Sequence, residues 1–127
     1  MTVLSTTVRT AHMQAIIDAA GASAKIKFYD GTVPTGGGAP AGTLLATLTG
    51  STTIGTASAG VLDFDEAGFT QNNASHVTGT PTFIRITTSA DAFVADIPVG
   101  GGVTVTGTIT TGVDVTFNAS TITAGNA

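Results

Sequence analysis

The chain has 127 residues, a length typical of one domain, and only 9% of them are charged. Four Lys and Arg against eight Asp and Glu give a net charge of −4, so the chain lacks a basic surface for phosphates, which argues against nucleic-acid binding. Cys is absent, which removes disulfides, thiol nucleophiles and thiolate metal sites. Low charge with 42% hydrophobic residues indicates a folded chain.

The N-terminal region predicts one helix. Residues 6–20 have an amphipathic period of 3.6, Ser5 or Thr6 can cap the start, and Gly21 suits the position after the end. We expect His12 to be a packed or half-exposed helix residue near the apolar side. That side is predicted to comprise Val8, Ala11, Ala15, Ile16 and Ala19.

No signal peptide or membrane segment is expected. The small residues at 22–24 resemble a cleavage site, but Gln14 and Asp18 interrupt the apolar core that should precede it. The uncharged stretch 31–62 is long enough to span a bilayer, yet its Gly, Pro, Ser and Thr content could not satisfy the backbone of a lipid-facing helix.

From residue 24 the apolar period changes to two, which predicts strands. In the first strand Ile26 and Phe28 face one way, while Lys25 and Lys27 face the other. Strands are expected at 25–29, 43–49, 61–65, 82–87, 92–97, 103–106, 113–118 and 121–123, with 82–87 and 92–97 forming a hairpin.

The segments between these strands are expected to be loops. Residues 31–42 and 69–79 are predicted to be irregular, 50–60 a loop or a weakly paired edge, and 100–102 a hinge or turn. Short strands separated by Gly/Pro turns predict one mainly-β domain over 1–127. Its antiparallel sheets over 24–127 are expected to form a β-sandwich or jelly-roll-like arrangement, after one short N-terminal helix.

Three acidic residues form the best candidate metal site. Asp63 and Asp65 should point to one side of a strand, and Glu66 could join them. Ca²⁺ is usually coordinated by six to eight oxygen ligands, which is more than this cluster offers. A solvated strand end is therefore the favoured interpretation.

The sequence shows no catalytic or cofactor-binding pattern. His76 could serve as a general base, but nothing near it in sequence is an activated nucleophile, and we expect a solvated loop residue. The glycine runs at 36–38 and 100–102 precede strand-like sequence instead of a helix N-terminus, so a phosphate loop is rejected. We therefore expect a protein that is not an enzyme and has no cofactor.

The order of the segments carries a resemblance to a known class. After the helix comes KIKFYDGTVP at 25–34, then a Gly/Ala-rich loop and LLATL at 44–48, then GTPTFIRI at 79–86 and ITAG at 122–125. This pattern resembles small β-rich structural proteins of tailed bacteriophages, most like head decoration (cement) proteins. The resemblance implies a virion protein that binds the major capsid protein on the outer head surface as a homo-oligomer, with no nucleic acid and no membrane as partner.

The N-terminal segment is the candidate contact element, since a terminus is free to reach a partner. Its apolar residues are Val3, Leu4, Val8 and Met13. Burial of these residues against the chain's own sheet is an equal alternative. Other functions stay open: a tail, connector or fibre protein, a receptor- or glycan-binding module, or a small hydrolase that uses His76 or Asp65.

Overall fold

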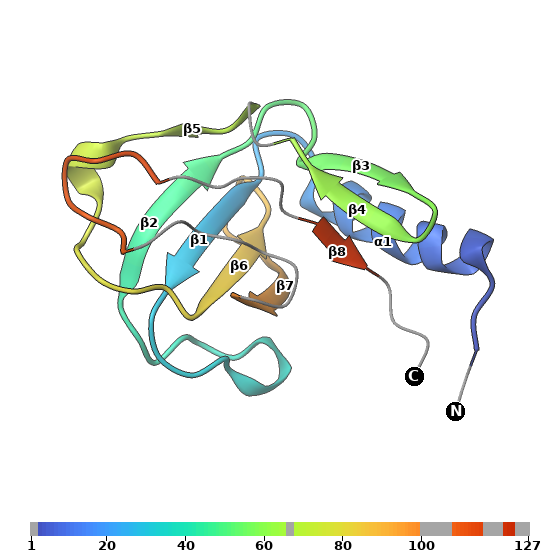
Figure 1. Ribbon diagram of the computed structural model, residues 1–127, viewed down its shortest axis with the longest axis horizontal. Helices are drawn as coiled ribbons and strands as arrows, with labels where there is room; N and C mark the ends of the chain where they lie inside the picture. Colours follow the sequence, from blue (N-terminus) through green and yellow to red (C-terminus); the bar gives the residue numbers. More distant parts are fainter. Residues whose placement is uncertain (1–2, 66–67, 100–107, 116–120, 124–127) are drawn as a thin grey trace.

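The computed structural model describes residues 3–65, 68–99, 108–115 and 121–123 (Figure 1). Its elements are, in chain order, α1 (Thr6–Ala20), β1 (Lys25–Tyr29), β2 (Leu44–Thr49), β3 (Gly55–Ser58), β4 (Val61–Phe64), β5 (Thr70–Gln71), β6 (Phe83–Thr87), β7 (Phe93–Pro98) and β8 (Thr121–Thr123). Short 3₁₀ turns occupy Thr35–Gly37 and Asn73–Ser75.

The strands of the described part of the chain form two antiparallel sheets. One has the strand order β5-β2-β1-β6-β7, and the other has the order β3-β4-β8. The prediction of a mainly-β fold with antiparallel sheets and one N-terminal helix is confirmed. The finer description of the sheets as a β-sandwich or jelly roll stays a prediction.

Helix α1 has the predicted bounds and caps. The Ser5 hydroxyl accepts a hydrogen bond from the Val8 N–H at 3.2 Å, which satisfies one of the free donors at the helix start. The helix ends at Gly21, whose φ of +71° lies where a side chain would be strained, and whose N–H donates to the Ile17 carbonyl.

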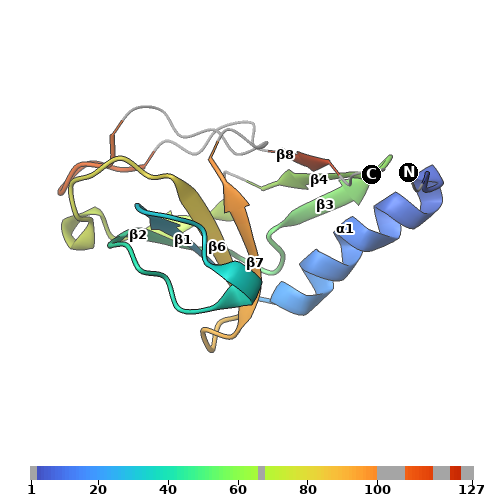
Figure 2. The same cartoon turned by 90° about the horizontal axis from the view of Figure 1, so that it is seen from below.

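The predicted inner face of α1 is wrong. The structure buries Met13, Ile17 and Ala20 and half-buries Ile16. It exposes four of the five residues expected inside: Val8, Ala11, Ala15 and Ala19. The helix packs on β3 and β4 (Figure 2), and turning its larger apolar side chains inward removes more area from water than burying alanines would. His12 is exposed, which corrects the expectation of a packed or half-exposed residue.

Strand β1 is the centre of the larger sheet and confirms the period-two prediction. Ile26 and Phe28 are fully buried, and the lysines at 25 and 27 lie on the opposite face. The strand pairs antiparallel with β2 and with β6. Burying side chains of this size contributes about 1.5–3 kcal/mol each. The buried apolar cluster that contains them also draws on α1, both sheets and segment 108–115: Met13, Ile17, Leu62, Phe64, Ile84, Ile86 and Ile109.

The remaining strand predictions divide into three groups. The hairpin of β6 and β7 and the last strand, β8, are confirmed, and 50–60 contains the edge strand β3. The predicted irregular segment 69–79 contains the two-residue strand β5. Residues 113–115 form no strand, and 100–107 and 116–118 lie outside the described residues. In the part of the chain described, no helix combines the length and apolar character needed to cross a membrane.

Candidate functional site

The structure separates the four residues of the candidate contact element. Val3 has 77% of its surface exposed, Val8 is also exposed, and Leu4 is half-buried. Met13 is 7% exposed and belongs to the chain's own core, packed under the sheet of β3 and β4. Met13 is therefore corrected from a partner contact to a core residue, while Val3 and Val8 present apolar surface at the start of α1.

The described acidic residues of the candidate metal site lie at the end of strand β4. Asp63 on β4 and Asp65 just after it are both exposed, and Glu66 lies outside the described residues. Within the residues described, no group of three His, Cys, Asp or Glu side chains is placed to hold a metal ion. Asp63 and Asp65 thus present two carboxylates to solvent, and we call this pair the acidic strand end.

The prediction that His76 is a solvated loop residue is wrong. Its side chain is buried, with the residue 3% exposed, and ring Nδ1 lies 3.1 Å from the Val113 carbonyl oxygen. Because a carbonyl oxygen only accepts, Nδ1 is the donor in this hydrogen bond. Among the described residues, buried Nε2 has no hydrogen-bond partner.

The burial of His76 comes from a contact between two loops far apart in the chain. The Gln71 side chain accepts from the Val115 N–H at 2.7 Å and donates to the Val115 carbonyl at 3.3 Å, as a paired strand would. The Asn73 amide donates to the Asp114 carboxylate, and the Thr111 hydroxyl donates to the carbonyl of residue 76. Segments 70–79 and 108–115 are thereby joined, and we call them together the loop end.

A hollow of about 540 Å³ opens beside β2 at the loop end. Leu45 and Ala46 line it with apolar surface, and Thr47, Thr70 and Asn72 add hydroxyl and amide groups. Among the described residues that line the hollow there is no carboxylate. The Ser75 hydroxyl, which also borders the hollow, accepts from the Asn72 amide. Hydroxyl and amide groups beside apolar surface suit hydrogen bonding to an uncharged polar group.

Three large apolar side chains are exposed around the loop end. They belong to Leu44 at the start of β2, Val77 and Val113. The three lie on connected segments, because the Val77 N–H donates to the Leu45 carbonyl at 2.8 Å and the Val113 carbonyl is the partner of His76. Exposed apolar residues grouped in this way are typical of a contact surface.

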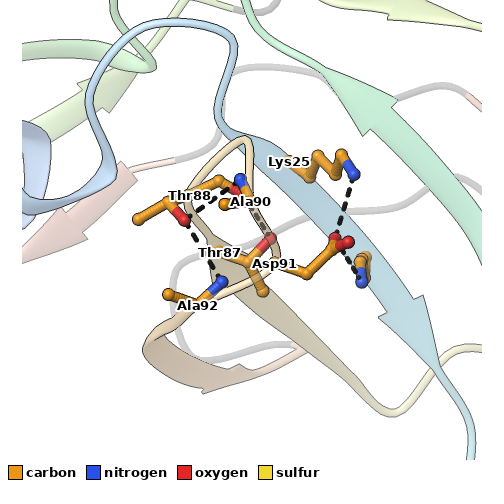
Figure 3. A network of polar contacts seen from close by, with 7 residues as sticks. Lys25, Thr87, Thr88, Ala90, Asp91 and Ala92 are labelled. Atoms are coloured by element: carbon orange, nitrogen blue, oxygen red, sulfur yellow. Dashed lines mark hydrogen bonds and ion pairs between the residues drawn. The ribbon is translucent and has the colours of Figure 1, made fainter.

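A cluster of charges occupies the outer face of the larger sheet. The ammonium groups of Lys25 and Lys27 lie 3.0 Å and 2.9 Å from the same oxygen, Oδ1 of Asp91. Figure 3 shows the Asp91 carboxylate turned from the β6–β7 turn toward Lys25 on β1. These ammonium groups lower the pKa of Asp91, chiefly through the hydrogen bond from Lys27 and then that from Lys25. We call Lys25, Lys27 and Asp91 the lysine face.

The turn that carries Asp91 is held by its own hydrogen bonds. The Thr88 hydroxyl accepts from the N–H groups of Ala90 and Ala92 (Figure 3). The Asp91 N–H donates to the Thr88 carbonyl. Asp91 has a φ of +67°, in the left-handed region, which Asp tolerates better than most residues do. The turn therefore fixes the carboxylate over the lysines.

A buried ion pair continues the same face. Arg85 on β6 donates from Nε and Nη2 to the two carboxylate oxygens of Asp96 on β7, at 2.7 Å and 2.8 Å. The hydrogen bond that Arg85 donates to Asp96 raises the pKa of Arg85, against the lowering effect of burial. Nη2 also donates to the Gly38 carbonyl, and the Phe93 ring covers the guanidinium at 4.8 Å. Arg85 thus ties the loop before β2 to the sheet.

Sequence reasoning found part of these sites. It placed both lysines on one face of β1 and did not assign them a partner. The hairpin predicted from 82–87 and 92–97 places Asp91 in its turn, but it does not give the direction of the carboxylate. The burial of His76 has no local signal, since its partner lies 37 residues away.

Comparison with protein-family models, with curated proteins and with solved structures gives no match to this chain. Its function is therefore inferred from its own sequence pattern and surface.

Proposed function

We propose that this protein is a structural component of a tailed-bacteriophage virion, a decoration protein that binds the outer head surface and stabilises the shell. It would contact the major capsid protein and act as a homo-oligomer. The sequence pattern at 25–34 and 79–86 suggests this class. The observation that carries the proposal is the exposure of apolar side chains at two separate places, the start of α1 and the loop end.

The two apolar surfaces lie at opposite ends of the molecule's long axis. In Figure 1 the start of α1 is at the right, and segments 72–79 and 108–115 are at the left. A protein that contacts a neighbour at each end can bridge two shell subunits. Stable contacts of this kind bury about 800 Å² on each partner, and binding only the assembled shell stabilises it by mass action.

The test is binding to shells that lack the protein. Purified protein mixed with such shells is expected to bind at a fixed stoichiometry and to raise the temperature at which the shells disrupt. Electron microscopy of the complex then shows whether the density lies on the head. No saturable binding, or density only in the tail, connector or fibre, would overturn the decoration function.

Variants at each end test the bridging. Val8→Asp and Val113→Asp each place a charge in one apolar surface, and each is expected to reduce the rise in disruption temperature. Thr52→Asp, at an exposed position in the turn between β2 and β3 and outside both surfaces, is the matched control. If all three variants behave alike, the apolar ends are not the contacts.

The hollow beside β2 favours one other function, the binding of an uncharged polar ligand such as a glycan. Its volume of about 540 Å³ falls in the usual range of ligand sites, and its rim is lined by hydroxyl and amide groups. A glycan array separates this function from shell binding: hits that Thr47→Val abolishes would support it, and an array without hits would dismiss it.

A further inference from the structure

The positive charge of this chain is concentrated on one face. Of its four Lys and Arg residues, Lys25, Lys27 and Arg85 lie on the outer face of the larger sheet. The fourth, Arg9 on α1, is half-buried against Gly60. Three cations on this face meet two carboxylates, Asp91 and Asp96, although the whole chain carries a charge of −4. The face is therefore positive on a negative molecule.

The lysine face retains capacity to bind a further carboxylate. Each ammonium group has three N–H donors, and both lysines direct one toward the same Asp91 oxygen. The side chains of Lys25 and Lys27 are 28% and 17% exposed, so part of each is open to a partner. The Arg85–Asp96 pair, by contrast, is nearly enclosed and already complete.

The same chain presents the complementary group. Asp63 and Asp65 of the acidic strand end are exposed, and they lie on β4 and its end, in the other sheet. Two copies with a net charge of −4 repel each other unless oppositely charged surfaces meet. The lysine face and the acidic strand end are such a pair.

We propose that the lysine face docks the acidic strand end of a second copy of the chain. Lys25 and Lys27 donate to the carboxylates of the other copy's Asp63 and Asp65, beside the internal contact with Asp91. The two surfaces differ, so the contact either repeats in a ring or occurs twice across a two-fold axis. This deepens the proposed function, on which it rests for its biological setting, by naming the surfaces that make the oligomer.

The experiment is sedimentation velocity on the free protein, at low and at physiological ionic strength. The wild-type chain is expected to self-associate, and more weakly as salt screens the charges. Lys25→Glu and Asp63→Lys are each expected to weaken the association about tenfold or more, because like charges then face each other. An equimolar mixture of the two variants is expected to recover it, since each reversed charge then meets its opposite.

Asp18→Lys is the matched control, because Asp18 is an exposed carboxylate on α1 and the charge change equals that of Asp63→Lys. It is expected not to weaken association. Circular dichroism checks the folding of each variant, and Asp63→Lys leaves the lysine face untouched. A wild-type chain that stays monomeric at every concentration, an Asp18→Lys variant as weak as Asp63→Lys, or a mixture that does not recover would each overturn the proposal. Because no shell is present, failure here and failure of shell binding are separate results.

Discussion

The larger sheet and the loop end are held together in different ways. In the sheet, β1 lies between β2 and β6 with continuous backbone pairing and with Ile26 and Phe28 fully buried. At the loop end, segments 70–79 and 108–115 share the isolated backbone bridge between Gly79 and Ile109 and a set of side-chain hydrogen bonds. The sheet distributes its stability over many repeated contacts, whereas the loop end depends on a few particular side chains.

The consequence is a difference in tolerance. Replacing one exposed residue of a paired strand leaves the backbone pairing in place, since that pairing uses no side chain. Replacing Gln71 or His76 removes that residue's own hydrogen bonds to segment 108–115, and the backbone bonds between Gly79 and Ile109 are left to hold the two segments. The exception inside the sheet is Arg85, where a buried charge makes one side chain as critical as any at the loop end.

The largest expected effect is the loss of Arg85. Arg85→Met leaves the Asp96 carboxylate buried without a cation, and removing one partner of a buried pair costs about 3–5 kcal/mol. Urea unfolding measures the change in the free energy of unfolding. The double variant Arg85→Met with Asp96→Leu removes both charges and is expected to recover most of the loss. A double variant as unstable as the single one would contradict the role of the uncompensated carboxylate.

A substitution at the loop end is expected to lower the free energy of unfolding less than the loss of Arg85 does, and to affect mainly the loop end itself. His76→Ala removes the donor to the Val113 carbonyl and leaves a space beside the core, at a cost of about 1–3 kcal/mol. Hydrogen exchange is expected to speed up at the Val115 N–H, which donates to Gln71, while the amides of β1 keep their protection. Thr80→Ala, at an exposed position just past segment 70–79, is the control. Equal loss of protection in β1 would show that the two regions do not open separately.

The contrast between local patterns and contacts of distant segments also explains how much of the fold can be predicted from the sequence. Helix α1 and strand β1 have the predicted bounds because caps and periodicity are local properties. The predicted inner face of α1 is wrong because alanines make a second apolar stripe, and only the packing on β3 and β4 selects the side with Met13 and Ile17. Segment 113–115 alternates like a strand, yet its groups bind the side chains of 71–76 instead of a neighbouring strand.

The candidate sites also contain a part that local sequence predicts and a part that depends on contacts between distant segments. Alternation alone places the two lysines of the lysine face on one side of β1. Their shared partner Asp91 depends on the three-dimensional direction of a turn, which Thr88 fixes through its hydroxyl. The exposed group of Leu44, Val77 and Val113 forms only because two distant segments meet, so no local pattern could indicate it.

The smallest expected effect is the pH dependence of stability that Asp91 contributes. This effect separates the lysine face from the buried Arg85 pair. The lysines lower the pKa of Asp91 below its ordinary value of 3.8, so the folded chain binds this proton less readily than the unfolded chain does. The stabilisation is therefore fully present above the ordinary pKa and is lost as the pH falls through the lowered one. Asp91→Asn introduces a residue that also tolerates a φ of +67° and removes the charge.

Urea unfolding of wild type and Asp91→Asn across the acidic range measures this contribution. The variant is expected to be slightly less stable at neutral pH, with a difference that shrinks toward zero as the pH falls below the ordinary pKa of Asp. Added salt should reduce the difference at neutral pH, because the carboxylate is exposed and its attraction to the lysines is screened. A difference that is independent of pH would mean that the substituted amide alters the turn and that the charge contributes nothing.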